Sequence, residues 1–239
     1  MGNEYFQRLE LLIGNEGLKK LQNSSIAIFG IGGVGSYAVE ALVRGGVGTL
    51  TLIDPDVICA TNINRQIHAL ETTIGQPKVT VMAERCRAIN PQVRVISHQQ
   101  AYRQENGAEL LLDNHFDCVF DCIDNITDKL HLLQSCYEHS LPVISSMGAA
   151  NKLDPTQIKV ADISATKKCR LARTIRKELR NRGIEKGIKV VYSTEEFRPL
   201  TGVDAAERNP ILGSSSYLPP LFGLTMAGVA IQTLIGDID

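Results

Sequence analysis

The feature that most constrains this chain is a glycine-rich turn between a short apolar run and a helical pattern. The run Ser25–Phe29 leads into GIGGVG at positions 30–35, and helical periodicity then continues to Arg44. Glycines at this spacing let a strand turn tightly into a helix and bring the helix N-terminus against a phosphate group. Without a ligand, four glycines in six positions would only weaken the helix start. The turn therefore predicts a nucleotide-binding strand–turn–helix unit, which many Rossmann oxidoreductases also contain.

Apolar runs bounded by turn residues alternate with helical periodicity through the first two-thirds of the chain. This order predicts a Rossmann-like α/β fold, with a mostly parallel sheet and helices on both faces. We expect strands at 25–29, 49–53, 93–97, 117–121, 142–145, 157–162 and 188–192. We expect helical pieces within 4–22 and helices at 35–44, 78–89, about 105–112, 127–139, 166–182 and after Pro219-Pro220, with Gly183 ending the helix 166–182.

No Pro- or Ser-rich linker divides the chain, which predicts one globule in two parts. Residues 1–162 would form the nucleotide-binding domain. Residues 163–239 would complete the same globule with a basic helix, a crossover segment and a C-terminal helix.

Charge is distributed unevenly, although the formal net charge is only −1. Residues 167–189 carry ten basic and two acidic side chains, a local balance of +8, so the rest of the chain carries −9. Such a strip indicates an anionic partner, with a solvated amphipathic helix as the alternative. The candidate partner-binding residues are Lys167, Lys168, Arg170, Arg173, Arg176, Lys177 and Arg180.

Cysteine usage and hydropathy indicate a soluble protein of the reducing cytoplasm, with no membrane partner. The six cysteines are scattered, and no C-x-x-C pair is present to hold structural zinc. The longest apolar run, 221–235, is interrupted by Gly, Thr and Gln, and we expect it to be too short to span a bilayer. Cys169 lies between two basic residues, which favours a reactive thiolate, although chance exposure is the simpler interpretation.

Polar residues beyond the expected strand ends distinguish ATP chemistry from hydride transfer. Asp54 ends the second strand, where a carboxylate can accept hydrogen bonds from ribose hydroxyls. Arg65 and Lys78 can together neutralise a triphosphate and the departing pyrophosphate, which a nicotinamide dehydrogenase does not need. Asp124 follows the central strand and is the candidate Mg²⁺ ligand, because a carboxylate facing a triphosphate requires a cation between them. Asp121 is the structural alternative at this strand end.

The glycine turn, Asp54, the run Asn62-Ile63-Asn64-Arg65-Gln66, Lys78 and the run Asp121–Asn125 together resemble the adenylating enzymes of the ubiquitin-activating, thiamine- and molybdopterin-biosynthesis superfamily. The match extends from Arg8 to Ala150. In that superfamily a substrate carboxylate attacks the α-phosphate of ATP-Mg²⁺, giving an acyl adenylate and pyrophosphate. The resemblance assigns catalytic roles to Arg65, Lys78, Asp124, Asn62 and Arg8, and nucleotide-binding roles to Gly30, Gly32, Gly33, Gly35, Asp54, Asn64 and Gln66. It also implies a homodimer, in which Arg8 reaches into the neighbour's nucleotide site.

Further segments extend the resemblance over nearly the whole chain, to the tRNA threonylcarbamoyladenosine dehydratases. These segments are Arg65–Ala69, Ser146–Ala149, Asp154–Gln157 and the basic stretch 166–182. Those enzymes activate the threonine carboxylate of N6-threonylcarbamoyladenosine in tRNA, and the neighbouring carbamoyl group closes a ring with loss of AMP. The expected partners are therefore ATP, Mg²⁺ and this modified tRNA, with a sulfur-relay protein as a further candidate. Because ring closure is intramolecular, it needs no enzyme thiol.

Two alternatives remain open from the sequence. The first is an enzyme that adenylates the C-terminal glycine of a ubiquitin-like sulfur carrier. The second is a non-catalytic protein that binds nucleotide as a structural ligand.

Overall fold

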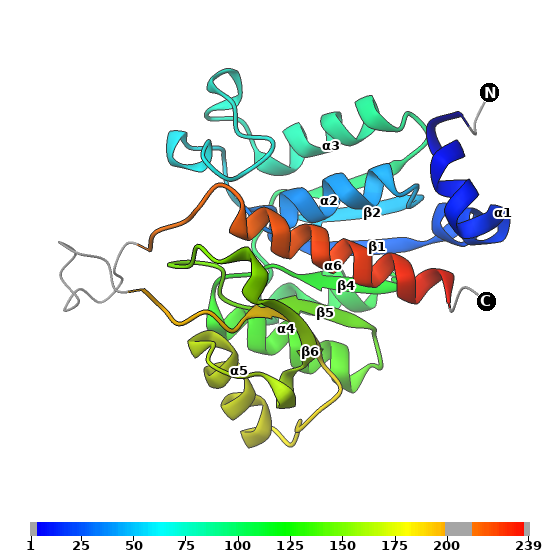
Figure 1. Ribbon diagram of the computed structural model, residues 1–239. Coiled ribbons are helices and arrows are strands. Elements are labelled where there is room, and N and C mark those ends of the chain that lie inside the picture. Colours follow the sequence, from blue (N-terminus) through cyan, green and yellow to red (C-terminus); the bar gives the residue numbers. More distant parts are fainter. Residues whose placement is uncertain (1–3, 199–211, 237–239) are drawn as a thin grey trace.

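The computed structural model describes residues 4–198 and 212–236 and is built on one seven-stranded sheet (Figure 1). The strand order is β3-β2-β1-β4-β5-β7-β6, and neighbouring strands are parallel except that β6 runs antiparallel to β7. This confirms the predicted Rossmann-like, mostly parallel α/β fold. The strands are β1 (Ser25–Phe29), β2 (Thr49–Ile53), β3 (Arg94–His98), β4 (Cys118–Asp121), β5 (Val143–Ser146), β6 (Ile158–Asp162) and β7 (Lys189–Ser193).

Helices occupy the segments between the strands, close to the predicted ranges. The α-helices are α1 (Gln7–Asn23, kinked at Gly14), α2 (Gly35–Arg44), α3 (Lys78–Ile89), α4 (Ile126–Glu138), α5 (Arg170–Asn181) and α6 (Leu218–Ile235). The predicted helix near 105–112 is instead a 3₁₀ turn, Gln104–Asn106, followed by a five-residue π-turn, Ala108–Leu112.

The central strands of the sheet are buried on both faces, and β1 shows how its sequence produces this. Successive side chains of a strand point to opposite faces, and every residue of β1 after Ser25 is buried. Ile26 and Ile28 belong to the core under α2, α3 and α6, whereas Ala27 and Phe29 belong to the core under α4 and α5. Figure 1 shows these two helical layers. The uninterrupted apolar run is therefore that of a central parallel strand.

Helix α6 corrects one expectation about the apolar C-terminal run. The helix has 18 residues and is long and apolar enough by length and composition to cross a membrane, so the expectation that the run is too short is wrong. Half of it is buried within the protein. A Cβ added at Gly223 would lie 2.2 Å from the carbonyl oxygen of Val34, which shows how closely α6 packs on the start of α2. The two prolines lie in the first turn of α6, where their missing N–H groups are not needed.

The strand order places a crevice at the carboxyl ends of β1 and β4. From β1 the chain continues to β2 on one side, and it later returns at β4 on the other side of β1. The neighbouring strands β1 and β4 therefore form the topological switch point of the sheet. Ligands of open α/β sheets bind outside the carboxyl ends of the strands at such a point. Phe29, at the end of β1, lies beside Asp121, at the end of β4. The glycine turn and the run after Asp121 therefore meet across this crevice.

Candidate active site

A cavity of about 840 Å³ opens at the carboxyl edge of the sheet. One end, called here the nucleotide end, is lined by the glycine turn, the end of β2 and the segment before α3. The other, called here the α5 end, is lined by residues after β5, the N-terminus of α5 and Phe197. The nucleotide end includes Gly30, Gly32, Gly33, Asp54, Asp56, Asn62, Arg65, Gln66 and Lys78, and the α5 end includes Met147–Ala150, Lys152 and Lys168–Leu171.

The glycines of the turn have different roles. A Cβ at Gly30, where φ is +92°, would lie 2.7 Å from the Cys122 carbonyl oxygen, and one at Gly35 would lie 1.9 Å from the Gly30 carbonyl oxygen. These two glycines therefore let strand, turn and helix pack together. Gly35 is not among the residues that line the cavity. A Cβ at Gly32 would meet only the Gln66 amide nitrogen, at 3.8 Å, so its open side is free for a phosphate.

Asp54 supports the glycine turn from the end of β2. One carboxylate oxygen accepts a hydrogen bond from the Ile31 N–H at 2.6 Å, and the other accepts one from the Asp56 N–H at 2.9 Å. The residue is only 5% exposed. Burial raises the pKa of Asp54 above its usual value, and the charge of Lys78 opposes that shift. Asp54 lines the cavity, and it also fixes the backbone on which a phosphate would rest.

Lys78 begins α3 and is buried between two carboxylates. Its Nζ lies 2.6 Å from Asp56 and 3.7 Å from Asp54. The contact with Asp56 has no signal in the sequence, because only the loop between β2 and α3 brings the two residues together. The same loop is held by a hydrogen bond from the Lys78 N–H to the Asp56 carbonyl at 3.1 Å. The ammonium is thus held rigidly at the cavity wall.

Three residues of the run 62–66, namely Asn62, Arg65 and Gln66, line the nucleotide end of the cavity. The Arg65 guanidinium donates to the Thr61 carbonyl and to the Asn64 side chain, both at 2.8 Å. Asn64 does not line the cavity. Its amide donates to the Ser214 carbonyl at 3.0 Å, so it supports Arg65 and joins this loop to the segment before α6. Gln66 is 6% exposed, and its Oε1 has no partner among the described residues.

The two aspartates after β4 have separate roles. Asp121 is fully buried, and its Oδ2 lies 2.7 Å from the Lys129 ammonium and accepts a hydrogen bond from the Ser145 hydroxyl at 2.5 Å. Asp121 is therefore structural. Asp124 is exposed on the cavity wall, and its carboxylate makes no hydrogen bond or ion pair within the described ranges. Lys129, which the sequence did not single out, is the fourth residue of α4.

The α5 end combines a buried thiol with a cation over an aromatic ring. Cys169 is 6% exposed and caps α5 by accepting the Ala172 N–H at 3.5 Å, so the expectation of chance surface exposure is wrong. This cap also starts α5 four residues later than predicted. The Arg170 guanidinium lies 4.3 Å from the centre of the Phe197 ring.

Beyond the cavity, the polar face of α5 is basic, while Ala172, Ile175 and Leu179 pack inward. Gly183, with φ of +78°, ends the helical segment as predicted. Arg176 is half-buried and hydrogen-bonds the Thr166 carbonyl at 2.9 Å and the Thr166 hydroxyl, so it is less available to a partner than expected. Of the seven candidate partner-binding residues, the exposed ones are Lys167, Lys168, Arg170, Arg173, Lys177 and Arg180.

Arg8 lies apart from these residues. It is exposed in the first turn of α1 and does not line the cavity of its own chain.

Gly32 leaves room for a phosphate at the start of α2, and Arg65 and the buried Lys78 line the same cavity. Asp124 adds a carboxylate that has no partner among the described residues. These are the features of an ATP-dependent adenylating enzyme. The chain matches the ThiF family model over residues 6–239 and belongs to this family.

Two relatives are similar over almost the whole chain. The tRNA threonylcarbamoyladenosine dehydratase of Bacillus subtilis is 43% identical over 244 residues, covering 98% of this chain and 96% of the relative. The Escherichia coli tRNA N6-threonylcarbamoyladenosine dehydratase has been solved with AMP (TM-score 0.90, 35% identity) and with ATP (TM-score 0.88, 34% identity). Each match covers 97% of this chain and 94% of the solved chain.

Adenylyltransferases are similar over a shorter part of the chain. The molybdopterin-synthase adenylyltransferase of Haemophilus influenzae is 34% identical over 58% of this chain and 56% of its own length. The sulfur-carrier alternative is therefore not favoured.

Proposed function

We infer that this protein catalyses the ATP-dependent cyclisation of N6-threonylcarbamoyladenosine in tRNA, through adenylation of the threonine carboxylate. The observation that carries this proposal is one cavity that joins a nucleotide end to the basic N-terminus of α5. The near full-length similarity to the Bacillus and Escherichia dehydratases supports it.

In the first step, a carboxylate oxygen of the threonyl group attacks the α-phosphorus of ATP. A new O–P bond forms, the bond between the α- and β-phosphates breaks, and pyrophosphate leaves. Arg65 and Lys78 stabilise the charge that develops on the phosphates, because fixed cations in a partly water-excluded site act strongly on a transition state. The open side of Gly32 receives a phosphate at the start of α2, and Asp54 holds the ribose.

Asp124 suits the magnesium ion that such a reaction requires. Its carboxylate lines the cavity and has no partner among the described residues. Within the same ranges, no group of three His, Cys, Asp or Glu side chains could hold a metal. Mg²⁺ commonly binds through one or two carboxylates, substrate phosphates and water, so Asp124 together with ATP is an adequate donor set. When bound, the ion would neutralise phosphate charge.

In the second step, the carbamoyl group attacks the activated acyl carbon. A ring bond forms, the acyl–phosphate bond breaks, AMP leaves, and the proton lost from the carbamoyl N–H passes to solvent. The net change in the nucleoside is the loss of one water. Because both groups belong to one substituent, effective molarities of about 10⁵ M or more are available without a covalent enzyme intermediate. The cavity thiols agree with this. Burial raises the pKa of the Cys122 thiol, which disfavours the nucleophilic thiolate, and the Cys169 sulfur caps α5.

The exposed basic face of α5 binds the tRNA backbone in this proposal. Lysine and arginine contacts to phosphates supply affinity that falls as salt rises. At the cavity mouth, Arg170 and Phe197 form a cation–aromatic pair of the kind on which unstacked RNA bases lie. The target nucleoside can therefore leave its loop and enter the α5 end while the tRNA backbone lies along α5.

The remaining parts of the proposal concern assembly and location. We propose a homodimer in which Arg8 completes the neighbour's nucleotide site, because it is exposed and lies away from its own cavity. A sulfur-relay protein is a further candidate partner. The proposed place of action is the cytoplasm, where tRNA is available.

The test is mass spectrometry of nucleosides from tRNA carrying threonylcarbamoyladenosine, after treatment with the protein, ATP and Mg²⁺. We expect a nucleoside lighter by one water, together with AMP and pyrophosphate. Lys78→Met should abolish all three products, whereas Lys159→Met, on exposed β6, should form them normally. A wild-type protein that releases no AMP and leaves the nucleoside mass unchanged would refute the function. Pyrophosphate exchange that depends on a sulfur-carrier protein and ignores tRNA would favour the alternative.

A further inference from the structure

Lys152 is a buried lysine on the cavity wall that the reaction described above leaves unused. It follows β5, is 5% exposed, and lines the α5 end. Its Nζ donates one hydrogen bond, to the Ser193 carbonyl at 3.0 Å. An ammonium has three donors, and within the described ranges no carboxylate forms an ion pair with Lys152. Because buried charges are normally paired, an ammonium in this position lacks an anionic partner.

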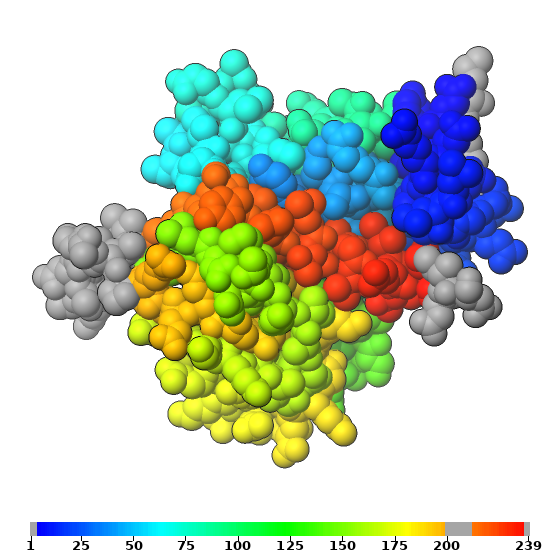
Figure 2. Space-filling view, viewed as in Figure 1, coloured from blue at the N-terminus to red at the C-terminus, as the bar shows by residue number. Residues whose placement is uncertain are grey.

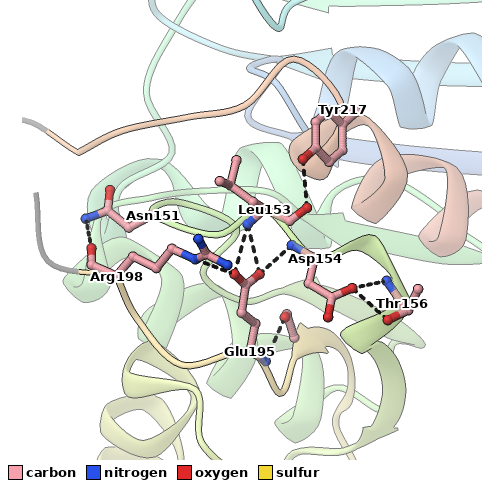
Figure 3. Close-up of polar contacts among 8 residues, drawn as sticks. Asn151, Leu153, Asp154, Thr156, Glu195, Arg198 and Tyr217 are labelled. Carbon is pink, nitrogen blue, oxygen red and sulfur yellow. Dashed lines mark hydrogen bonds and ion pairs between the residues drawn. The ribbon is translucent and has the colours of Figure 1, made fainter.

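Glu195 is the carboxylate whose charge acts on Lys152, but its oxygens are engaged elsewhere. They accept hydrogen bonds from the Leu153 N–H at 2.8 Å and the Asp154 N–H at 2.7 Å, and from Arg198 Nε at 2.9 Å (Figure 3). Glu195 therefore fixes the backbone directly after Lys152 and holds that segment against the end of β7. It positions Lys152 without neutralising it.

The same segment is fixed from the C-terminal side. The Tyr217 hydroxyl donates to the Leu153 carbonyl at 2.7 Å, and the Asn151 side chain accepts the Gly213 N–H at 2.6 Å. Figure 2 shows the segment near residue 150, in light green, packed against the orange start of α6. Lys152 thus lies on a loop that is held by β7 on one side and by residues 213–217 on the other. A side chain that binds a ligand in one fixed geometry needs such a rigid support.

The electrostatics of the α5 end favour an anion. The N-terminus of α5, at Cys169–Leu171, faces the same cavity, and the backbone there carries partial positive charge. Lys168 and Arg170 add two cations. Burial lowers the pKa of Lys152, and the Cys169 thiol and Glu195 oppose that shift. A bound carboxylate would oppose it further.

The geometry points to Lys152 as the residue that binds the carboxylate of the threonylcarbamoyl group and so distinguishes the modified nucleoside from plain adenosine. This inference rests on the proposed function and adds the recognition of its substrate. Before adenylation, the ammonium pairs with the carboxylate and aligns it for attack. After adenylation, the same donor hydrogen-bonds the acyl carbonyl oxygen, where negative charge develops during ring closure.

The test compares the binding of two tRNAs that differ only in the threonylcarbamoyl group, in the presence of a non-hydrolysable ATP analogue. We expect the wild-type protein to bind modified tRNA at least about tenfold more tightly than unmodified tRNA, since a desolvated charge pair is worth that much or more. Lys152→Met should lose this preference while binding unmodified tRNA as the wild type does. Lys159→Met, which removes an exposed lysine of β6, should keep the preference.

Several outcomes separate the inference from the proposed function. A folded Lys152→Met protein that binds the ATP analogue normally and keeps the tenfold preference overturns the inference alone. If Lys152→Met does not fold, Lys152→Gln decides instead, because its amide is a polar donor without charge, and loss of the preference is then expected. A wild-type protein that converts modified tRNA without preferring it also overturns the inference. One that neither prefers nor converts it overturns the function as well.

Discussion

Substituting Gly32 separates phosphate binding from folding, because its open side faces the cavity. A Cβ at this position would contact only the Gln66 amide nitrogen, at 3.8 Å, and the φ of Gly32 lies outside the left-handed range. Gly32→Ala should therefore change the free energy of unfolding by no more than about 1 kcal/mol. Any change should be a gain, because alanine lowers the conformational entropy of the unfolded chain. The new methyl group would occupy space that a phosphate oxygen needs to reach the backbone N–H groups.

The expected loss is that of one charge-assisted hydrogen bond, about 1.5–3 kcal/mol. At 1.4 kcal/mol per tenfold, this raises the Kd for ATP by about 10- to 150-fold. Isothermal titration with ATP-Mg²⁺ measures the affinity, and urea denaturation measures the stability. A Gly32→Ala protein of normal stability that binds ATP within about twofold of wild type would refute the assignment of the phosphates to this turn.

Two matched glycines serve as controls for this experiment. Gly228 is exposed on α6 with nothing within 4 Å of its added Cβ, so Gly228→Ala should stabilise the protein by up to about 1 kcal/mol and leave ATP affinity unchanged. At Gly35 the added Cβ would lie 1.9 Å from a carbonyl oxygen. Gly35→Ala should therefore lose stability, by about 1–3 kcal/mol or more, together with nucleotide binding.

Three further predictions concern stability, pH and salt. Lys129→Met leaves the buried Asp121 carboxylate unpaired and should lower the free energy of unfolding in urea by about 3–5 kcal/mol, whereas a loss below about 1 kcal/mol would contradict the buried pair. Burial raises the pKa of Glu40, but the hydrogen bonds and charges of Arg85 and Arg44 together outweigh burial and the net pKa is lowered, so Glu40 stabilises the fold above its unfolded pKa of about 4.3. Glu40→Gln should thus be less stable than wild type in urea at pH 7, with the difference vanishing as pH falls below about 4, and a constant difference would disprove this linkage. Lys177→Glu should weaken tRNA binding and reduce the slope of log K against log salt by about one, and an unchanged slope would exclude Lys177 from the phosphate contacts.

Most of the fold could be predicted because the signals that define it are local. Five consecutive apolar or small residues bounded by turns identified β1, and a glycine after the apolar stripe of α5 identified its end. The start of α5 could not be placed correctly, because a cysteine rather than Ser, Thr, Asp or Asn caps it. The region 104–112 was also predicted incorrectly, since the apolar spacing of a π-turn resembles that of a short α-helix.

The site was predictable where the sheet topology fixes it and unpredictable where tertiary contacts decide it. Asp54, Arg65, Lys78 and Asp124 follow strands whose carboxyl ends must meet at one edge, and they all line the cavity. The pairing of Lys78 with Asp56 depends on the path of the intervening loop, which no periodicity encodes.

Lys152 lacked a sequence signal for the same reason. Its acceptor, Ser193, lies 41 residues further along the chain and reaches it only through the insertion of β7 beside β5. A lone lysine after a strand is ordinarily a surface residue, so burial in the folded protein is what marks it.

The position of β7 explains how one sheet can serve both ends of the cavity. The chain forms β6 at the sheet edge, crosses through α5, and returns as β7 between β5 and β6. This return brings the N-terminus of α5 and the end of β7 beside the carboxyl end of β5, next to the switch point that holds the nucleotide end. If β7 had added outside β6 instead, Ser193 and Glu195 would lie a strand further from Lys152. The basic helix α5 would then be separated from the nucleotide end of the cavity. The inserted strand β7 is therefore the element that joins the α5 end of the cavity, where we propose that tRNA binds, to the nucleotide end.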